Sequence, residues 1–332
     1  MENQVNVADS TLSRLFQACL PGASQKPAVL WPAFWQHDPA SECSPQAWID
    51  STLRFQEETG TALVKLTGPA HYQVVDRGVE GSWQGAPLGE RTFTRRAVHE
   101  LGDWEKIPAD FTAAEQMVVQ VAAEVRRRLP AEVPLLATVF SPATQALMLA
   151  EPACFAAQVK SAPEVIRAAL ARIAGQTAGL IARFAEAGVN GIFLVSKHHS
   201  PSLIAEPDYV TVIHQSDRLA MEACRVFAAN ILHLHGEPVH ALGWPEQDDW
   251  MLHIEPGSRN PARPHIRAKT SRPVLLALDY PAWERGDVAT PIRSGLAELG
   301  QHAAIVGSPC AVPLRYARSE IAAWVRRIRE LS

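Results

Sequence analysis

The sequence predicts an α/β fold, a single (β/α)8 TIM-type barrel, and three observations lead to it. The chain has 332 residues, enough for one large barrel domain. Roughly eight short apolar runs alternate with longer helical segments along its length. Several of these runs are apolar at successive positions, as expected when both faces of a parallel strand are buried. A doubly wound open sheet has the same periodicity and stays the alternative.

The strand-like runs share a short length and a high content of aliphatic and aromatic residues. We expect strands at 28–31, 62–66, 134–140, 191–195, 230–234, 240–244, 273–278 and 303–306. Two longer polar stretches, 67–108 and 245–273, interrupt the alternation. In a barrel both would follow strand ends, where functional loops gather, and the first reads as an excursion or small hairpin.

Helix boundaries are marked by recognisable signals. Ser44 followed by Pro45 predicts a start, with the helix running to about Glu58. A helix over 111–128 ends in three arginines, and cations in the last turn are typical of a helix end. Further helices are expected at 162–187, 208–224, 292–299 and 319–331, and the whole chain 1–332 is expected to be one domain with an N-terminal helical extension at about 1–27.

Composition and charge exclude several function classes. The net charge of -4 gives no basic field for nucleic acid or an anionic membrane. No run of about 18 apolar residues is present, and the N-terminus lacks the pattern of a secretory signal. Five scattered cysteines fit a reducing, cytoplasmic compartment. Phosphate-loop, dinucleotide-binding, nucleophile-elbow and H-E-x-x-H motifs are all absent from the sequence.

Histidines are concentrated in one part of the chain. Eight of the 12 lie between His198 and His265. Within the strand-like run 230–234 and just after it, His233 and His235 are two positions apart, so they project to the same face. Two imidazoles on one face could serve as two ligands of a metal ion or as a pair of groups that transfer protons. Two satisfied core histidines are the alternative interpretation.

Cys310 lies in a Gly/Pro-rich turn that follows the run 303–306. A thiolate near His233 and His235 would complete a set of two nitrogen ligands and one sulfur ligand. The fourth position would stay open, as in catalytic zinc centres. A lone cysteine that serves as a small buried hydrophobe is the alternative.

Four further residues are candidates for catalysis. Lys197 and His198 follow the run 191–195 and could bind carboxylates or move protons. Asp38 closes an aromatic segment that could line a pocket. Lys65 lies within an apolar strand, so its ammonium needs either a route to solvent or an anionic partner.

These pieces, in this order, resemble the uroporphyrinogen decarboxylase superfamily over about 28–328. The strand that ends at Phe140 looks like the family's "G-P-F-T-L" region, and 187–193 resembles its "A-G-A-D" strand, with Ser196 near the loop that follows. The run 231–236 stands in the place of "H-x-C-G", and 307–313 in the place of "G-C-G-x-P". The family fold is a (β/α)8 barrel, in agreement with the expected strands.

The superfamily contains two main chemistries. True uroporphyrinogen decarboxylases hold their polyanionic substrate with an N-terminal "R-Q-A-G-R", whereas the matching segment 30–38 has no arginine. The other branch contains zinc-dependent enzymes that move methyl groups between corrinoid proteins and thiols, with ligands in the pattern H-x-C … C. His233, His235 and Cys310 match that pattern with one cysteine replaced by histidine.

The resemblance therefore implies a zinc-dependent methyltransferase acting on a thiol or a small methylated metabolite. It also implies a corrinoid protein as partner and a homodimer, and we expect Trp31, Phe140 and Ser196 to contact the cofactor. A cofactor-free decarboxylase and a non-catalytic barrel that binds a tetrapyrrole, corrinoid or metal remain alternatives. Glu237, Glu255 and Asp279 are unranked further ligands or proton-transfer groups, and His99, His253 and His302 are expected on solvated loops or surfaces.

Overall fold

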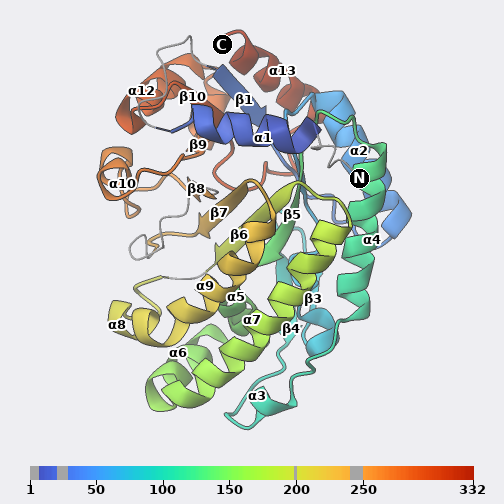
Figure 1. Ribbon diagram of the computed structural model, residues 1–332, viewed down its shortest axis with the longest axis vertical. Coiled ribbons are helices and arrows are strands. Elements are labelled where there is room, and N and C mark those ends of the chain that lie inside the picture. The colour runs from blue at the N-terminus through green and yellow to red at the C-terminus, as the bar shows by residue number, and fades with distance from the viewer. Residues whose placement is uncertain (1–6, 21–28, 198–199, 240–249) are drawn as a thin grey trace, which may run out of the picture.

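The computed structural model describes residues 7–20, 29–197, 200–239 and 250–332. Parallel strands line its centre, and helices cover their outer side (Figure 1). The parallel strands are β1 (Val29–Ala33), β2 (Val64–Leu66), β5 (Leu135–Phe140), β6 (Gly191–Lys197), β7 (Asn230–His235), β8 (Trp250–Ile254), β9 (Leu276–Ala277) and β10 (Ala303–Gly307). Their side chains are almost all buried, as the continuous apolar runs predict.

The strands follow one another around the barrel in chain order. Parallel ladders join β2, β5, β6, β7 and β8, and a second set joins β9, β10 and β1. A bridge between Leu252 and Val274 links β8 to the segment that enters β9. On the other side, the Ala62 amide donates to the Pro32 carbonyl at 2.8 Å and links β1 to the segment before β2. The predicted (β/α)8 class is confirmed.

Helices alternate with these strands and form the outer layer. They are α1 (Val7–Ala18), α2 (Pro45–Thr59), α3 (Asp103–Lys106), α4 (Ala113–Arg128), α5 (Pro142–Leu149), α6 (Pro152–Ser161), α7 (Pro163–Glu186), α8 (Glu206–Asp208), α9 (His214–Ala223), α10 (Arg263–Lys269), α11 (Tyr280–Glu284), α12 (Ala289–Leu299) and α13 (Arg318–Arg329). The Ser44 hydroxyl accepts from the Ala47 amide at the start of α2, which confirms the predicted cap. Gly60, at a φ of 69°, ends that helix in the left-handed conformation that glycine adopts without steric cost.

The start of α4 carries a reciprocal capping box, which leads to our first prediction. The Thr112 hydroxyl accepts from the Glu115 amide at 3.2 Å, and the Glu115 carboxylate accepts from the Thr112 amide at 2.9 Å. Thr112→Ala is expected to lower the free energy of unfolding by about 1 kcal/mol, because one amide loses its acceptor. Urea unfolding measures this change. Thr112→Ser keeps the hydroxyl and should match the native protein, so equal loss in both variants would contradict the assignment.

Helix α7 is, in the described ranges, the one helix long and apolar enough to cross a membrane. It packs against α5, α4 and α9, and its inner face buries Ile166, Leu170 and Ile173. Arg167 and Arg183 lie on its other side, where Arg183 stacks on Phe111. This division of apolar and charged residues accounts for α7 as a packed helix of the barrel.

The two polar stretches have different structures. The first contains an antiparallel hairpin of β3 (Glu80–Trp83) and β4 (Arg91–Arg95), as predicted. For the second, the prediction of a loop over 245–273 was wrong, because β8 occupies Trp250–Ile254. Its five residues are all buried, and they form a short, mostly apolar run inside a polar stretch. The predicted strand at 240–244 lies outside the described residues.

Candidate metal centre

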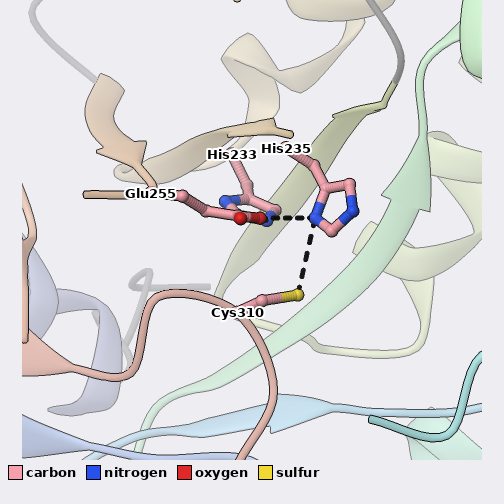
Figure 2. Close-up of side chains that lie close together, drawn as sticks. All are labelled: His233, His235, Glu255 and Cys310. Carbon is pink, nitrogen blue, oxygen red and sulfur yellow. Dashed lines mark hydrogen bonds and ion pairs between the residues drawn. The ribbon is translucent and has the colours of Figure 1, made fainter. Parts of the chain in front are cut away.

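Four side chains with metal-binding atoms converge near the ends of strands β7, β8 and β10 (Figure 2). His233 and His235 come from the end of β7, Glu255 follows β8, and Cys310 lies in the turn after β10. One ligand atom of each residue lies within 4.8 Å of the others. The structure thus brings together the three residues of the predicted ligand set and adds a carboxylate.

Strand geometry explains why these side chains meet. Successive side chains of β7 alternate in direction, so His233 and His235 share one face. In the parallel register His233 lies beside His253 of β8. Glu255 is two positions beyond His253, just as His235 is two positions beyond His233, so the carboxylate arrives next to the second imidazole.

The distances within the cluster are close to those between ligands of a single metal ion. Cys310 Sγ lies 3.6 Å from His235 Nδ1, and His233 Nε2 lies 3.6 Å from Glu255 Oε1. Ligands at the usual zinc–nitrogen and zinc–sulfur distances in a tetrahedron are about 3.3–3.7 Å apart. The pair of His235 Nδ1 and Glu255 Oε1, at 2.5 Å, is closer, because these atoms form an ion pair.

His233 supports the fit of a metal ion. It is 2% exposed, and among the described groups its Nε2 has no hydrogen-bond partner, with Glu255 Oε1 lying 3.6 Å away. A buried imidazole is normally hydrogen-bonded, since leaving it unsatisfied costs free energy. A metal ion at this place would use the free lone pair of Nε2. The residues present, two imidazoles, a thiol and a carboxylate, are those that zinc prefers.

The pKa values in the cluster depend on burial and on the ion pair. Burial by itself would lower the pKa of His235, but its contacts with Cys310 and Glu255 raise it to about 9. Burial would raise the pKa of Glu255, yet His235 holds it below its usual value. For His233, burial and the nearby His253 hold the pKa well below its usual value. His233 is therefore neutral at pH 7, the form that binds a metal.

His253 was expected on a solvated surface, and this expectation was wrong. Its side chain is 0% exposed in β8, and its ring lies 4.4 Å from the ring of His233. Burial lowers its pKa to about 4, so the ring is neutral at pH 7. Its Nε2–H donates to the Ser308 carbonyl at 3.1 Å, which ties β8 to the turn that carries Cys310.

A small cavity of about 80 Å³ adjoins the cluster. His233, His235 and Cys310 line it, together with the predicted residues Lys65, Phe140 and Lys197. Lys65 comes from β2, and its Nζ lies 5.0 Å from the centre of the Phe193 ring and 5.6 Å from that of the Trp35 ring. Burial lowers the pKa of Lys65 to about 8.

A larger cavity of about 390 Å³ lies beside the first, and the two share Trp35, His37 and Lys65 in their walls. The predicted Asp38 lines the larger one. Its carboxylate accepts from the hydroxyls of Ser41 at 2.7 Å and Ser51 at 2.6 Å.

The remaining predicted residues lie elsewhere. Trp31 of β1 and Ser196 of β6 line neither cavity. For Ser196 the reason is the alternation of side chains along β6: its neighbours Val195 and Lys197 face the small cavity, so Ser196 faces the other way. His198 lies outside the described residues. Of the unranked acids, Glu237 accepts from Ser258 and from the backbone of Arg259, and Asp279 caps α11, so Glu255 alone reaches the cluster.

Comparison with known proteins shows which family and which solved structures this barrel resembles. The family described as Uroporphyrinogen decarboxylase (URO-D) matches residues 85–247, which include His233 and His235. A methyltransferase from Methanosarcina mazei has the same fold, with a TM-score of 0.77 and 15% identity over 96% of this chain and 98% of that one. A B12-independent methionine synthase from Shewanella sp. W3-18-1, solved in complex with selenomethionine, gives a TM-score of 0.57 and 14% identity over 92% and 96% of the two chains. No curated protein matches the sequence.

The family match and the shared fold agree with the resemblance found from the ordered motifs of the sequence. The match spans β6 and β7, and the likeness of fold extends over almost the whole chain. Residues 85–247 of the chain therefore resemble the uroporphyrinogen decarboxylase family, and almost the whole chain has the fold of the methyltransferase.

Proposed function

We propose that this protein is a zinc-dependent methyltransferase that forms a thioether from a thiol. The observation that carries the proposal is the convergence of His233, His235, Glu255 and Cys310, with one ligand atom of each within 4.8 Å of the rest. The methyltransferase and methionine synthase with the same fold support methyl transfer as the reaction class. A thiol or small methylated metabolite, a corrinoid protein as methyl carrier, and a cytoplasmic location complete the proposal.

His233 Nε2, His235 Nδ1 and Cys310 Sγ would hold the zinc ion, and Glu255 would be either a fourth ligand or the group that orients His235. When bound, zinc supplies a Lewis acid that lowers the pKa of a thiol substrate. In the reaction the thiol releases its proton to solvent, the sulfur forms a bond to the methyl carbon, and the donor leaves with the electron pair of the broken bond. Phe140 and Phe193 line the cavity beside the cluster and give it an apolar wall.

Demethylation of free methylcobalamin in the presence of a thiol tests the proposed reaction. Zinc-loaded protein is expected to bleach the cobalt–carbon absorbance in a thiol-dependent manner and to form the methyl thioether, detected by mass spectrometry. Protein stripped with a chelator should lose this activity and regain it when zinc is added.

Full activity of the metal-free protein would contradict the proposal. Release of carbon dioxide from a supplied tetrapyrrole acid would instead support the decarboxylase alternative. Ligand-dependent absorbance with no turnover would support a binding barrel.

A further inference from the structure

The two cavities of the barrel mouth adjoin each other and differ in size. His233, His235, Glu255 and Cys310 are called the donor cluster here, because they offer donor atoms for a metal ion. The cavity beside this cluster is about 80 Å³, which leaves room for only a few atoms. The larger one is about 390 Å³, within the range of pockets that bind small organic molecules. Because they share Trp35, His37 and Lys65, the larger cavity offers space for the body of a molecule whose reactive end lies at the donor cluster.

The larger cavity has flat aromatic walls. Trp35, Trp48, Phe55 and Trp83 line it. Neutral polar groups in its wall are already hydrogen-bonded within the protein: the Gln36 side-chain amide donates to two backbone carbonyls of the segment after β10. Rings that face one another at such surfaces attract through offset or edge-on contacts. The walls therefore favour a planar ring over a polar, branched ligand.

Most charged side chains of the two cavities have partners in the protein. His37 Nδ1 lies 2.7 Å from Glu42 Oε1, and Arg318 Nη1 lies 3.1 Å from Glu58 Oε2. Asp38 accepts from two serine hydroxyls, and Glu90 accepts from the Leu88 amide at 3.2 Å. These groups are held by short-range contacts and do not require a ligand.

Lys65 differs from them. In the parts of the chain that the structure describes, no carboxylate lies within ion-pair distance of its Nζ. The ammonium faces the rings of Trp35 and Phe193, and it interacts with Cys310 and Glu42 only through longer-range electrostatics. Its position within β2 places the partly exposed lysine in the wall that the two cavities share. An ammonium in this position is stabilised most by an anion that enters the cavity.

We propose that the larger cavity binds an aromatic or heteroaromatic ring that carries a carboxylate or similar anionic group, with the anion paired to Lys65 and the ring against Trp35 and its neighbours. As a statement about the substrate of the donor cluster, this rests on the proposed methyl transfer. As a statement about binding it does not, since neither Lys65 nor the aromatic walls belong to the set of metal ligands.

Titration of the metal-stripped protein with matched probes tests the inference. Indole-3-acetate and benzoate are the aromatic anions, indole-3-acetamide and benzamide their neutral counterparts, and cyclohexanecarboxylate the non-aromatic anion. Calorimetry and the fluorescence of the lining tryptophans report binding. Each aromatic anion is expected to bind saturably and about 10- to 100-fold more tightly than its neutral counterpart, the range of a charge-assisted hydrogen bond.

Variants separate the role of the charge from that of the fold. Lys65→Met keeps the unbranched stem and should remove the preference for the anion, whereas Lys65→Arg should retain part of it. Lys160→Met, at an exposed position of α6, is the matched control and should bind as the native protein does. Trp35→Leu should weaken the aromatic probes more than cyclohexanecarboxylate.

Equal binding of anionic and neutral probes, or an unchanged preference in Lys65→Met, would overturn the inference. Binding of cyclohexanecarboxylate as tight as that of benzoate would overturn its aromatic part. Aromatic anions that bind to a protein without methyl-transfer activity would leave the inference standing and remove the proposed function. Thiol methylation with no binding of any aromatic anion would leave the proposed function standing and overturn the inference.

Discussion

Alanine at His235 or at Cys310 is expected to remove bound zinc from the purified protein. The native chain should carry about one zinc ion. The His235 variant keeps one nitrogen and one sulfur of the three proposed ligands, and the Cys310 variant keeps two nitrogens. Either loss should weaken zinc binding by more than about 100-fold, since even changes to residues that only orient the ligands weaken metal binding about 10- to 100-fold. Elemental analysis after gel filtration measures the stoichiometry.

Matched controls exist for both residue types. His265→Ala changes an exposed histidine of α10, and Cys43→Ala an exposed cysteine before α2, so both should keep the native zinc content. Cobalt substitution adds an optical readout, because a thiolate ligand gives a charge-transfer band that Cys310→Ala should abolish. Stoichiometric zinc in both His235→Ala and Cys310→Ala, with circular dichroism unchanged, would show that the cluster is not the metal site.

The barrel could be predicted because most of its strands correspond to continuous apolar runs in the sequence. β5, β6 and β7 appear at the expected places, and the helix that begins after Ser44 starts where its cap predicts. β8 was missed for a physical reason: its five-residue run is interrupted by His253 and lies between polar segments. A run that short could equally pack as a loop, so periodicity alone does not identify it.

The candidate site could be predicted only in part for a related reason. His233 and His235 share a face by the alternation of a strand, a property of local sequence. Glu255 and His253 join them through the register of β7 with β8, which depends on two segments far apart in the sequence. Lys65 shows the same limit. The sequence left open a route to solvent or an anionic partner, and only the packed structure shows the ammonium in a cavity wall over two rings.

Lys65→Met is expected to stabilise the protein at pH 7 by about 2 kcal/mol. Burial lowers the pKa of Lys65 from 10.5 to about 8. That loss of proton affinity corresponds to about 3 kcal/mol, and water in the cavity screens part of it. Below pH 8 the lysine is charged in both states, and the folded state bears the whole cost of desolvation. Urea unfolding of metal-stripped protein measures the difference, because a bound cation would lower this pKa further.

The pH dependence identifies the cause of that difference. Between pH 8 and about 10.5 the unfolded chain keeps a proton that the folded chain has released, so the native protein gains stability as the pH rises. Lys65→Met lacks this gain, and its advantage should therefore disappear by about pH 10.5, while Lys160→Met should follow the native curve. A variant less stable than the native protein at pH 7 would show that Lys65 has a stabilising partner. A variant that is more stable and has also lost its preference for aromatic anions would show that the Lys65 ammonium lowers stability but is needed to bind the ligand.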